Sequence, residues 1–96
     1  MPAIGRIRQK IRWRDYYLSS HAEDELADDG FERADAEHAI LRGFVEKKLT
    51  ADPRGTRCRI EGPARDGRLM HVVCRFRETG SLIVITAYAK GDTDEM

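Results

Sequence analysis

Residues 57–89, RCRIEGPARDGRLMHVVCRFRETGSLIVITAYA, decide the fold of this chain. Apolar and charged side chains alternate in two parts of the stretch, which is the period of half-buried strands, and a third part is almost continuously apolar. The expected strands are Arg57–Glu61, Leu69–Arg77 and Ser81–Ala89. The segment 62–68, which holds a proline and an Asp-Gly pair, and the Glu-Thr-Gly sequence at 78–80 are typical of turns. The stretch therefore predicts an antiparallel meander.

The residues before the meander carry the spacing and the end signals of helices. Residues 1–14 place isoleucines three or four positions apart with basic residues between them, which predicts a short amphipathic helix. A second helix, at about 20–29, begins with a capping box in which Ser20 is the first residue, and a third, at about 33–42, ends at a glycine. Residues 13–18 are expected to be extended, and Phe44–Leu49 is a further strand candidate.

Helices followed by strands predict an α+β fold. In this fold the N-terminal helices pack on one face of a three- to four-stranded antiparallel sheet. The alternation in residues 57–61 and 69–77 sends the two cysteines toward the helices and charged side chains away from them. The side chains expected on this second face are Arg57, Arg59, Glu61, His71 and Arg75. In the last strand Val84, Thr86 and Tyr88 share one face; the more polar choice places it on the charged side, and the opposite choice stays open.

The charges are segregated along the sequence, although the formal net charge is zero. Charged residues make up 35% of the chain, against roughly 25% in an average soluble domain. By segment, the net charge is +5 for residues 1–14, −8 for 15–37, +6 for 38–90 and −3 for 91–96. A polyanion would therefore meet a basic strand region and an acidic helical region.

The hydropathy pattern argues against membrane and secretory classes. No run of eighteen apolar residues is present, so no transmembrane helix and no membrane partner are expected. The first residues lack the pattern of a secretory signal, which favours a cytoplasmic protein with reduced thiols. Cys58 and Cys74 make neither a disulfide framework nor a zinc ligand set, and they are expected to act as small apolar side chains in the core.

Short motifs spread over about residues 16–89 resemble a bacterial family. They are Tyr17–Ala22, Gly30-Phe31, Asp35–Glu37, Leu41–Val45 and Ile83–Tyr88. Their order resembles the domain of unknown function 4258, which is similar to toxins with the RelE/ParE and barnase-like fold. The resemblance implies a RelE-like sheet. We expect a single domain, 1–96, with a basic helix in 1–14, a family-like core at 16–89 and an acidic tail at 90–96.

The resemblance implies a metal-independent endoribonuclease of a bacterial toxin–antitoxin pair, with no cofactor. Its expected partners are an RNA substrate and an antitoxin protein, in some cases of the YgiT type with a zinc finger. The chain departs from the family on the first helix after the His-Ala pair, where members commonly carry arginines and this chain carries acids. These acids are Glu23, Asp24, Glu25, Asp28 and Asp29. This helix is therefore expected to repel RNA or to dock a basic partner.

The charged face holds the residue types that metal-independent RNA cleavage requires. Such cleavage needs a base for the 2′-hydroxyl, an acid for the leaving oxygen and positive charge at the phosphate. His71 suits the proton transfers, and Arg75, about 13 Å further along the same strand, suits the phosphate. The candidate catalytic residues are His71, Arg75, Tyr88 and His21, and the candidate phosphate-binding residues are Arg57 and Arg59. No metal site is expected.

Two other functions fit the same residues. The basic strands also suit an ordinary solvated sheet face with acidic cross-strand partners. One alternative function is a non-enzymatic protein-interaction module of the same fold, whose acidic helix and basic sheet bind other proteins. The other alternative is an RNA-binding accessory domain without catalysis. Convergence of His71, Arg75 and Tyr88 in one cleft would favour the enzyme over the module.

Overall fold

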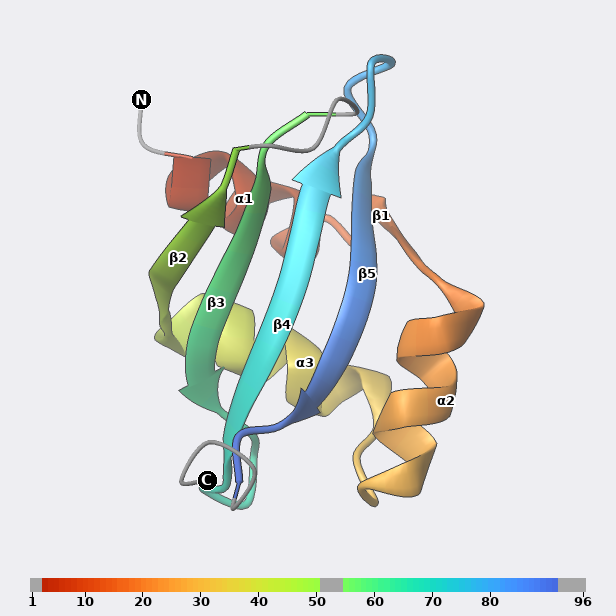
Figure 1. Cartoon of the computed structure of the whole chain (residues 1–96), viewed down its shortest axis with the longest axis vertical. Coiled ribbons are helices and arrows are strands. Elements are labelled where there is room, and N and C mark those ends of the chain that lie inside the picture. Colours follow the sequence, from red (N-terminus) through yellow and green to blue (C-terminus); the bar gives the residue numbers. More distant parts are fainter. Residues whose placement is uncertain (1–2, 51–54, 92–96) are drawn as a thin grey trace.

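The computed structural model describes residues 3–50 and 55–91. Within these ranges, three helices and five strands form an α+β domain (Figure 1). In chain order they are α1 (Ala3–Arg12), β1 (Tyr16–Leu18), α2 (Ser20–Asp28), α3 (Arg33–Arg42), β2 (Phe44–Leu49), β3 (Arg57–Pro63), β4 (Leu69–Phe76) and β5 (Leu82–Ala89). Most of the acidic tail expected at 90–96 lies outside the described residues. None of the described helices is long and apolar enough to span a membrane.

The strands form one mixed sheet in the order β1-β5-β4-β3-β2. Strands β2 to β5 are antiparallel neighbours, whereas β1 runs parallel to β5. The predicted antiparallel sheet of three to four strands is therefore wrong in strand number and in direction at one edge, since the described sheet has five strands. The missed strand is β1, inside the segment 13–18. It is only three residues long and pairs with Leu82–Val84 far along the chain, so no local pattern marks it.

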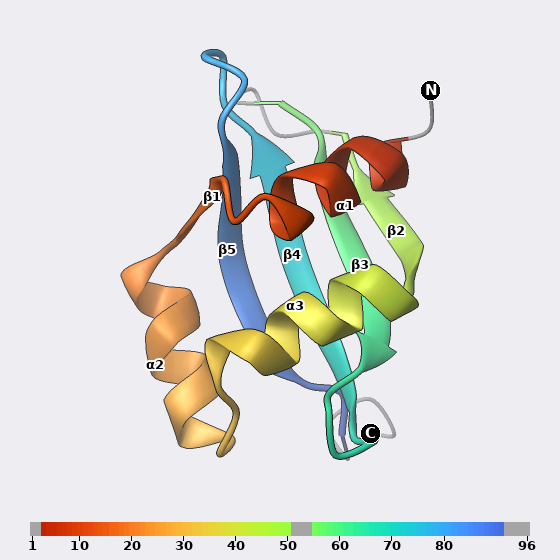
Figure 2. The same cartoon turned by 180° about the vertical axis from the view of Figure 1, so that it is seen from behind.

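Helices α1 and α3 cover one face of the sheet, as Figure 2 shows. Their buried side chains join those of the strands in one hydrophobic core. The core residues of the strands are Cys58, Ile60, Met70, Val72, Cys74, Leu82, Val84 and Ala87. Helix α2 instead runs beside β5 and reaches the core through Ala22 and Leu26. The expectation of helices on one face is therefore confirmed for α1 and α3, and α2 lies at the sheet edge.

Two carboxylates, one in α2 and one on the residue that caps its end, bind the edge of β5 beyond the end of β1. Oε1 of Glu25 accepts hydrogen bonds from the backbone N–H of Ala87 at 3.1 Å and from the hydroxyl of Thr86. Oδ2 of Asp29 accepts one from the backbone N–H of Ala89 at 2.8 Å. Backbone donors at a sheet edge need partners or water. Two of the acids that depart from the family pattern therefore complete the sheet edge.

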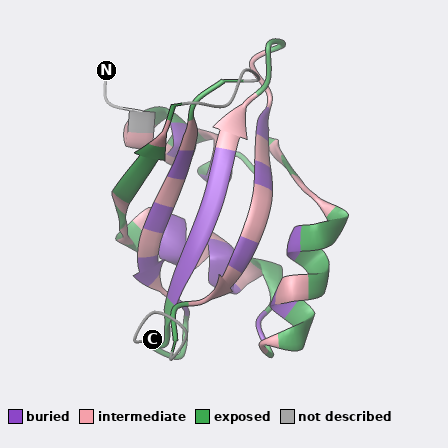
Figure 3. Cartoon of the chain, viewed as in Figure 1, coloured by how far each residue is buried: buried purple, intermediate pink, exposed green. Residues whose placement is uncertain are grey.

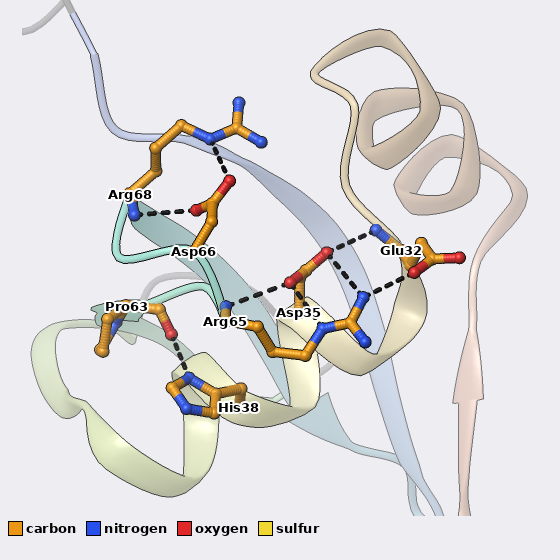
Figure 4. Close-up of polar contacts among 7 residues, drawn as sticks. All are labelled: Glu32, Asp35, His38, Pro63, Arg65, Asp66 and Arg68. Atoms are coloured by element: carbon orange, nitrogen blue, oxygen red, sulfur yellow. Dashed lines mark hydrogen bonds and ion pairs between the residues drawn. The ribbon is translucent and has the colours of Figure 1, made fainter.

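The β3–β4 connection is fixed to the first turn of α3 by Asp35 (Figure 4). Its Oδ1 accepts hydrogen bonds from the backbone N–H of Arg65 at 3.1 Å and from the Nε of Arg65 at 2.9 Å, and its Oδ2 accepts one from the backbone N–H of Glu32 at 2.8 Å. Further along α3, Nδ1 of His38 lies 2.8 Å from the carbonyl oxygen of Pro63. These contacts hold the β3–β4 hairpin in place against α3.

Candidate active site on the open sheet face

The sheet face opposite α1 and α3 is named here the open face, and it is turned toward the viewer in Figure 1. No described helix lies over it. Its side chains from β3, β4 and β5 are Arg57, Arg59, Glu61, His71, Val73, Arg75, Ile83, Thr86 and Tyr88. On the central strand β4, His71 and Val73 are buried, because they lie between side chains of the two neighbouring strands. Figure 3 shows β4 buried over most of its length.

A β-bulge in β5 decides which of its side chains reach the open face. The cross-strand pairing with β4 shifts by one residue at Ile85. Before the bulge Val84 faces the core, and after it Ala87 does. Thr86 and Tyr88 consequently lie opposite β4 residues of the open face, as the more polar choice predicts. The expectation that Val84 shares their face is wrong, because the bulge separates them.

Glu61, His71 and Tyr88 lie side by side across β3, β4 and β5. Nε2 of His71 is 3.1 Å from Oε1 of Glu61. The ring of Tyr88 packs edge-on against the imidazole, with the ring centroids 5.7 Å apart and an interplanar angle of 89°. Nδ1 of His71 is buried and has no hydrogen-bond partner among the described residues. Such a nitrogen is uncommon in folded proteins, which marks this row as a candidate site.

Two cations flank the row of Glu61, His71 and Tyr88. Nζ of Lys90 lies 3.0 Å from Oε1 of Glu61. The hydrogen bonds from Lys90, and next from His71, lower the pKa of the Glu61 carboxyl group, so that it is a carboxylate at neutral pH. On the other side lies Arg59, whose pKa is raised chiefly by Glu46 and to a smaller extent by the nearby Tyr88 hydroxyl. The row and its flanking residues therefore combine a carboxylate, an imidazole, a phenol and two cations.

Arg59 is held by Glu46 from the neighbouring strand β2. Nε of Arg59 donates to one carboxylate oxygen of Glu46 at 2.6 Å and Nη2 to the other at 3.1 Å. The pairing of β2 with β3 is irregular between Val45 and Lys47, which is where Glu46 lies. This two-point contact orients the guanidinium and offsets part of its charge.

Arg75 and Arg57 lie apart from this row. The pairing of Cys58 with Cys74, continued by one residue, places Arg57 opposite Arg75. Arg75 also pairs with Ile83 on β5, four residues along β4 from His71. The structure therefore brings together His71, Tyr88 and Arg59 of the predicted site, and it places Arg75 and Arg57 as a second basic pair on the same face.

His21 lies on α2 at the sheet edge. Its side chain is exposed, and its Nε2 is 3.5 Å from Oε1 of Glu25. The preceding serines explain part of the motif: the N-cap of the helix is Ser19, not the predicted Ser20. Oγ of Ser19 accepts a hydrogen bond from the N–H of Ala22 at 3.0 Å and donates one to the carbonyl oxygen of Ile85 at 2.7 Å. These contacts tie α2 to β5, so this part of the motif has a structural task.

Three residues in or beside the row were not predicted as site residues. They are Glu61, Lys90 and Glu46. A signal for Glu61 exists in the sequence, because closing the hairpin around its Asp-Gly turn sets Glu61 opposite His71. Lys90 follows the last strand, and Glu46 depends on an irregular pairing, so neither has a comparable signal. Among the described residues, no three His, Cys, Asp or Glu side chains are grouped to hold a metal ion.

Fold and site together define a small α+β domain that carries a row of ionisable side chains on the open face of a mixed sheet. The family model for Domain of unknown function (DUF4258) matches residues 18–89, about three quarters of the chain. The chain belongs to this family, as its motifs over residues 16–89 indicate. No curated protein and no solved structure shows a significant match to the chain.

Proposed function

We propose that the chain is a metal-independent endoribonuclease of the toxin type, with a RelE-like relation of helices to sheet, and that it acts at the open face. The observation that carries the proposal is the row of Glu61, His71 and Tyr88, flanked by Arg59 and Lys90. A carboxylate-bound imidazole next to cations supplies both proton transfer and charge stabilisation for cleavage of a phosphodiester. The second basic pair supports binding of the adjoining phosphates.

In the proposed reaction, Glu61 accepts the Nε2–H of His71 and orients the ring. Nδ1 of His71 then accepts the proton of a ribose 2′-hydroxyl, and the 2′-oxygen attacks the adjacent phosphorus. The bond from phosphorus to the 5′-oxygen breaks, the Lys90 ammonium protonates that oxygen, and a 2′,3′-cyclic phosphate remains. Arg59 stabilises the charge on the phosphate oxygens. Because Nδ1 is enclosed, RNA binding requires the packed side chains, Tyr88 above all, to move.

The test is cleavage of a labelled single-stranded RNA by the purified chain in excess EDTA. We expect the wild-type chain to cut the RNA and to leave a 2′-O-methylated copy intact, since that copy has no 2′-hydroxyl to attack. His71→Gln keeps a donor near Glu61 but has no group that accepts the proton, and Glu61→Gln removes the carboxylate. Each variant should lower the cleavage rate by about a hundredfold or more.

The matched control is His38→Asn, which alters a half-buried histidine on the helix side of the sheet. It should cut RNA at the wild-type rate. Equal cleavage by the wild-type chain and by folded His71→Gln would reject the site, and it would point to a contaminating nuclease. Absence of cleavage by the wild-type chain would reject the enzymatic proposal.

The second candidate function, a protein-interaction module, rests on the outer surface of α2. Glu25 and Asp29 bind β5, but Glu23, Asp24 and Asp28 remain exposed to solvent. These three acids suit a partner with a basic surface, such as an antitoxin protein encoded beside this chain. Co-purification of the neighbouring gene product with the wild-type chain, lost on charge reversal of the three acids, is the expected result. If that variant cleaves RNA at the wild-type rate but no longer co-purifies with the partner, RNA cleavage and partner binding use different surfaces.

A further inference from the structure

Cys58 and Cys74 are the only two cysteines of the chain, and they are direct partners on the neighbouring strands β3 and β4. Both are free thiols, and both side chains face the core, with 5% and 0% of their surface exposed. Opposed residues of antiparallel strands have Cα atoms roughly 4.5–5.5 Å apart, inside the range of about 4.4–6.8 Å that a disulfide spans. We propose that Cys58 and Cys74 are an oxidisable pair that closes a disulfide between β3 and β4.

Cys58 is the member of the pair that a dissolved oxidant reaches first. It lies near the start of β3, at a pocket at the end of the sheet. The pocket is lined by Arg6, Lys48, Thr50, Thr56, Cys58 and Phe76. Lys48 is also the partner of Cys58 on β2, and its positive charge favours the thiolate, against the effect of burial, which raises the pKa of this thiol. The two cations of the pocket suit an anionic oxidant.

Cys74 is the resolving thiol. It is fully enclosed, and burial raises the pKa of its thiol to about 12, so that it does not react directly with a dissolved reagent. Its position opposite Cys58 nevertheless places it beside any sulfur bound to Cys58. The order of reaction is therefore fixed by access, with Cys58 first and Cys74 second.

The oxidant of this proposal is a small anionic disulfide, for which glutathione disulfide is the probe. The Cys58 thiolate attacks one sulfur of glutathione disulfide, so that a mixed disulfide forms and one glutathione leaves. The sulfur of Cys74 then attacks that of Cys58, and the second glutathione leaves. Two protons pass from the protein thiols to the two glutathione thiolates, the protein pair is oxidised by two electrons, and glutathione disulfide is reduced.

The experiment incubates the folded chain with excess glutathione disulfide, alkylates the remaining thiols and measures the intact mass. We expect a monomer about 2 Da lighter than the reduced chain, with no alkyl group attached and with a peptide in which Cys58 is linked to Cys74. Its thermal unfolding midpoint should lie above that of the reduced chain, because the bond constrains the unfolded state.

Two single variants test the order of reaction in folded protein. Cys74→Ala should stop at the mixed disulfide on Cys58, and Cys58→Ala should take up no glutathione. Three results would each overturn the proposal: wild-type protein that keeps its bound glutathione, a disulfide-linked dimer, or thiols that link only in denaturant. The wild-type measurement decides the question even if a variant fails to fold.

Discussion

Gly62 lies where the backbone of β3 passes closest to the last turns of α3. A Cβ atom at this position would lie 2.8 Å from the carbonyl carbon of Ala39 and 2.9 Å from Cα of Gly43. Both neighbours are backbone atoms that cannot move without shifting a whole element. The absence of a side chain at Gly62 therefore sets the distance between α3 and the strand that carries Arg59 and Glu61.

We predict that Gly62→Ala lowers the free energy of unfolding by about 3 kcal/mol, because the added methyl group forces α3 away from β3. Urea denaturation followed by circular dichroism measures the change. Gly91→Ala is the control, since a Cβ there meets nothing within 4 Å. Equal stability of the two variants would show that α3 and β3 are not packed as described.

Asp35 makes the stability of the domain depend on pH. The Arg65 guanidinium, together with backbone N–H groups, lowers the pKa of the Asp35 carboxyl group from 3.8 to about 2. A lowered pKa in the folded state stabilises the protein above the unfolded value. That contribution is fully present above pH about 4 and disappears as the pH falls toward 2.

We predict that Asp35→Asn is less stable than the wild-type chain by about 2 kcal/mol at pH 7, since the ionised carboxylate is lost. The difference should shrink between pH 4 and pH 2, where the wild-type carboxyl group takes up its proton. Thermal or urea unfolding at several pH values measures it. A difference that stays constant down to pH 2 would contradict the role of the charge.

At the scale of elements, α2 acts as a cover for the sheet edge. Strand β1 pairs with the first half of β5, and the carboxylates of Glu25 and Asp29 bind backbone donors of the second half. An uncovered edge invites pairing with other chains, and the carboxylates occupy two of its donors. These two carboxylates therefore have a structural role that is independent of any ligand.

We predict that Glu25→Ala speeds hydrogen exchange of the Ala87 amide by roughly tenfold, because that N–H loses its acceptor. Exchange followed by nuclear magnetic resonance gives the rate at this single amide. Asp24→Ala, which removes an exposed acid of the same helix, should leave the rate unchanged. Unchanged exchange in Glu25→Ala would mean that α2 does not close the edge.

Features that depend on interactions between near neighbours in the chain were predicted from the sequence, and features that depend on distant contacts were missed. The hairpin of β3 and β4 and the helix 33–42 were predicted because alternation, an Asp-Gly turn and a terminal glycine are local signals. Strand β1 was missed because only its pairing with β5 defines it as a strand. The bulge at Ile85 likewise has no signal in the neighbouring sequence. Contacts between distant segments decide both features.

The same limit applies to the candidate site. His71 was placed on the charged face from strand alternation, and Tyr88 by the more polar of two orientations of the last strand. The structure shows the two rings in contact. Arg75 was grouped with them because it shares that face, but distance along the strand separates it from His71. Lys90 joins the site through a long side chain that reaches across to Glu61, which strand periodicity does not predict.

At the scale of the whole molecule, charge is divided between surfaces that do not face each other. The open face carries the arginines of β3 and β4, α1 and α3 cover the opposite face, and α2 with its acids stands at the edge beyond β5 (Figures 1 and 2). A net charge of zero is therefore compatible with an anionic substrate on one surface and a basic protein on another.

The most direct measurement of the central claim is a nuclear magnetic resonance titration of the labelled chain with a short 2′-deoxy oligonucleotide, which cannot be cleaved by attack of a 2′-oxygen. We predict that the largest shifts in amide signals fall on the open face, at Arg59, Glu61, His71, Tyr88 and Lys90. Signals of α3 should move little, because that helix lies behind the sheet. Shifts centred on α2 or on α1 and α3, or no shifts at low ionic strength, would contradict the assignment of the open face as the RNA site.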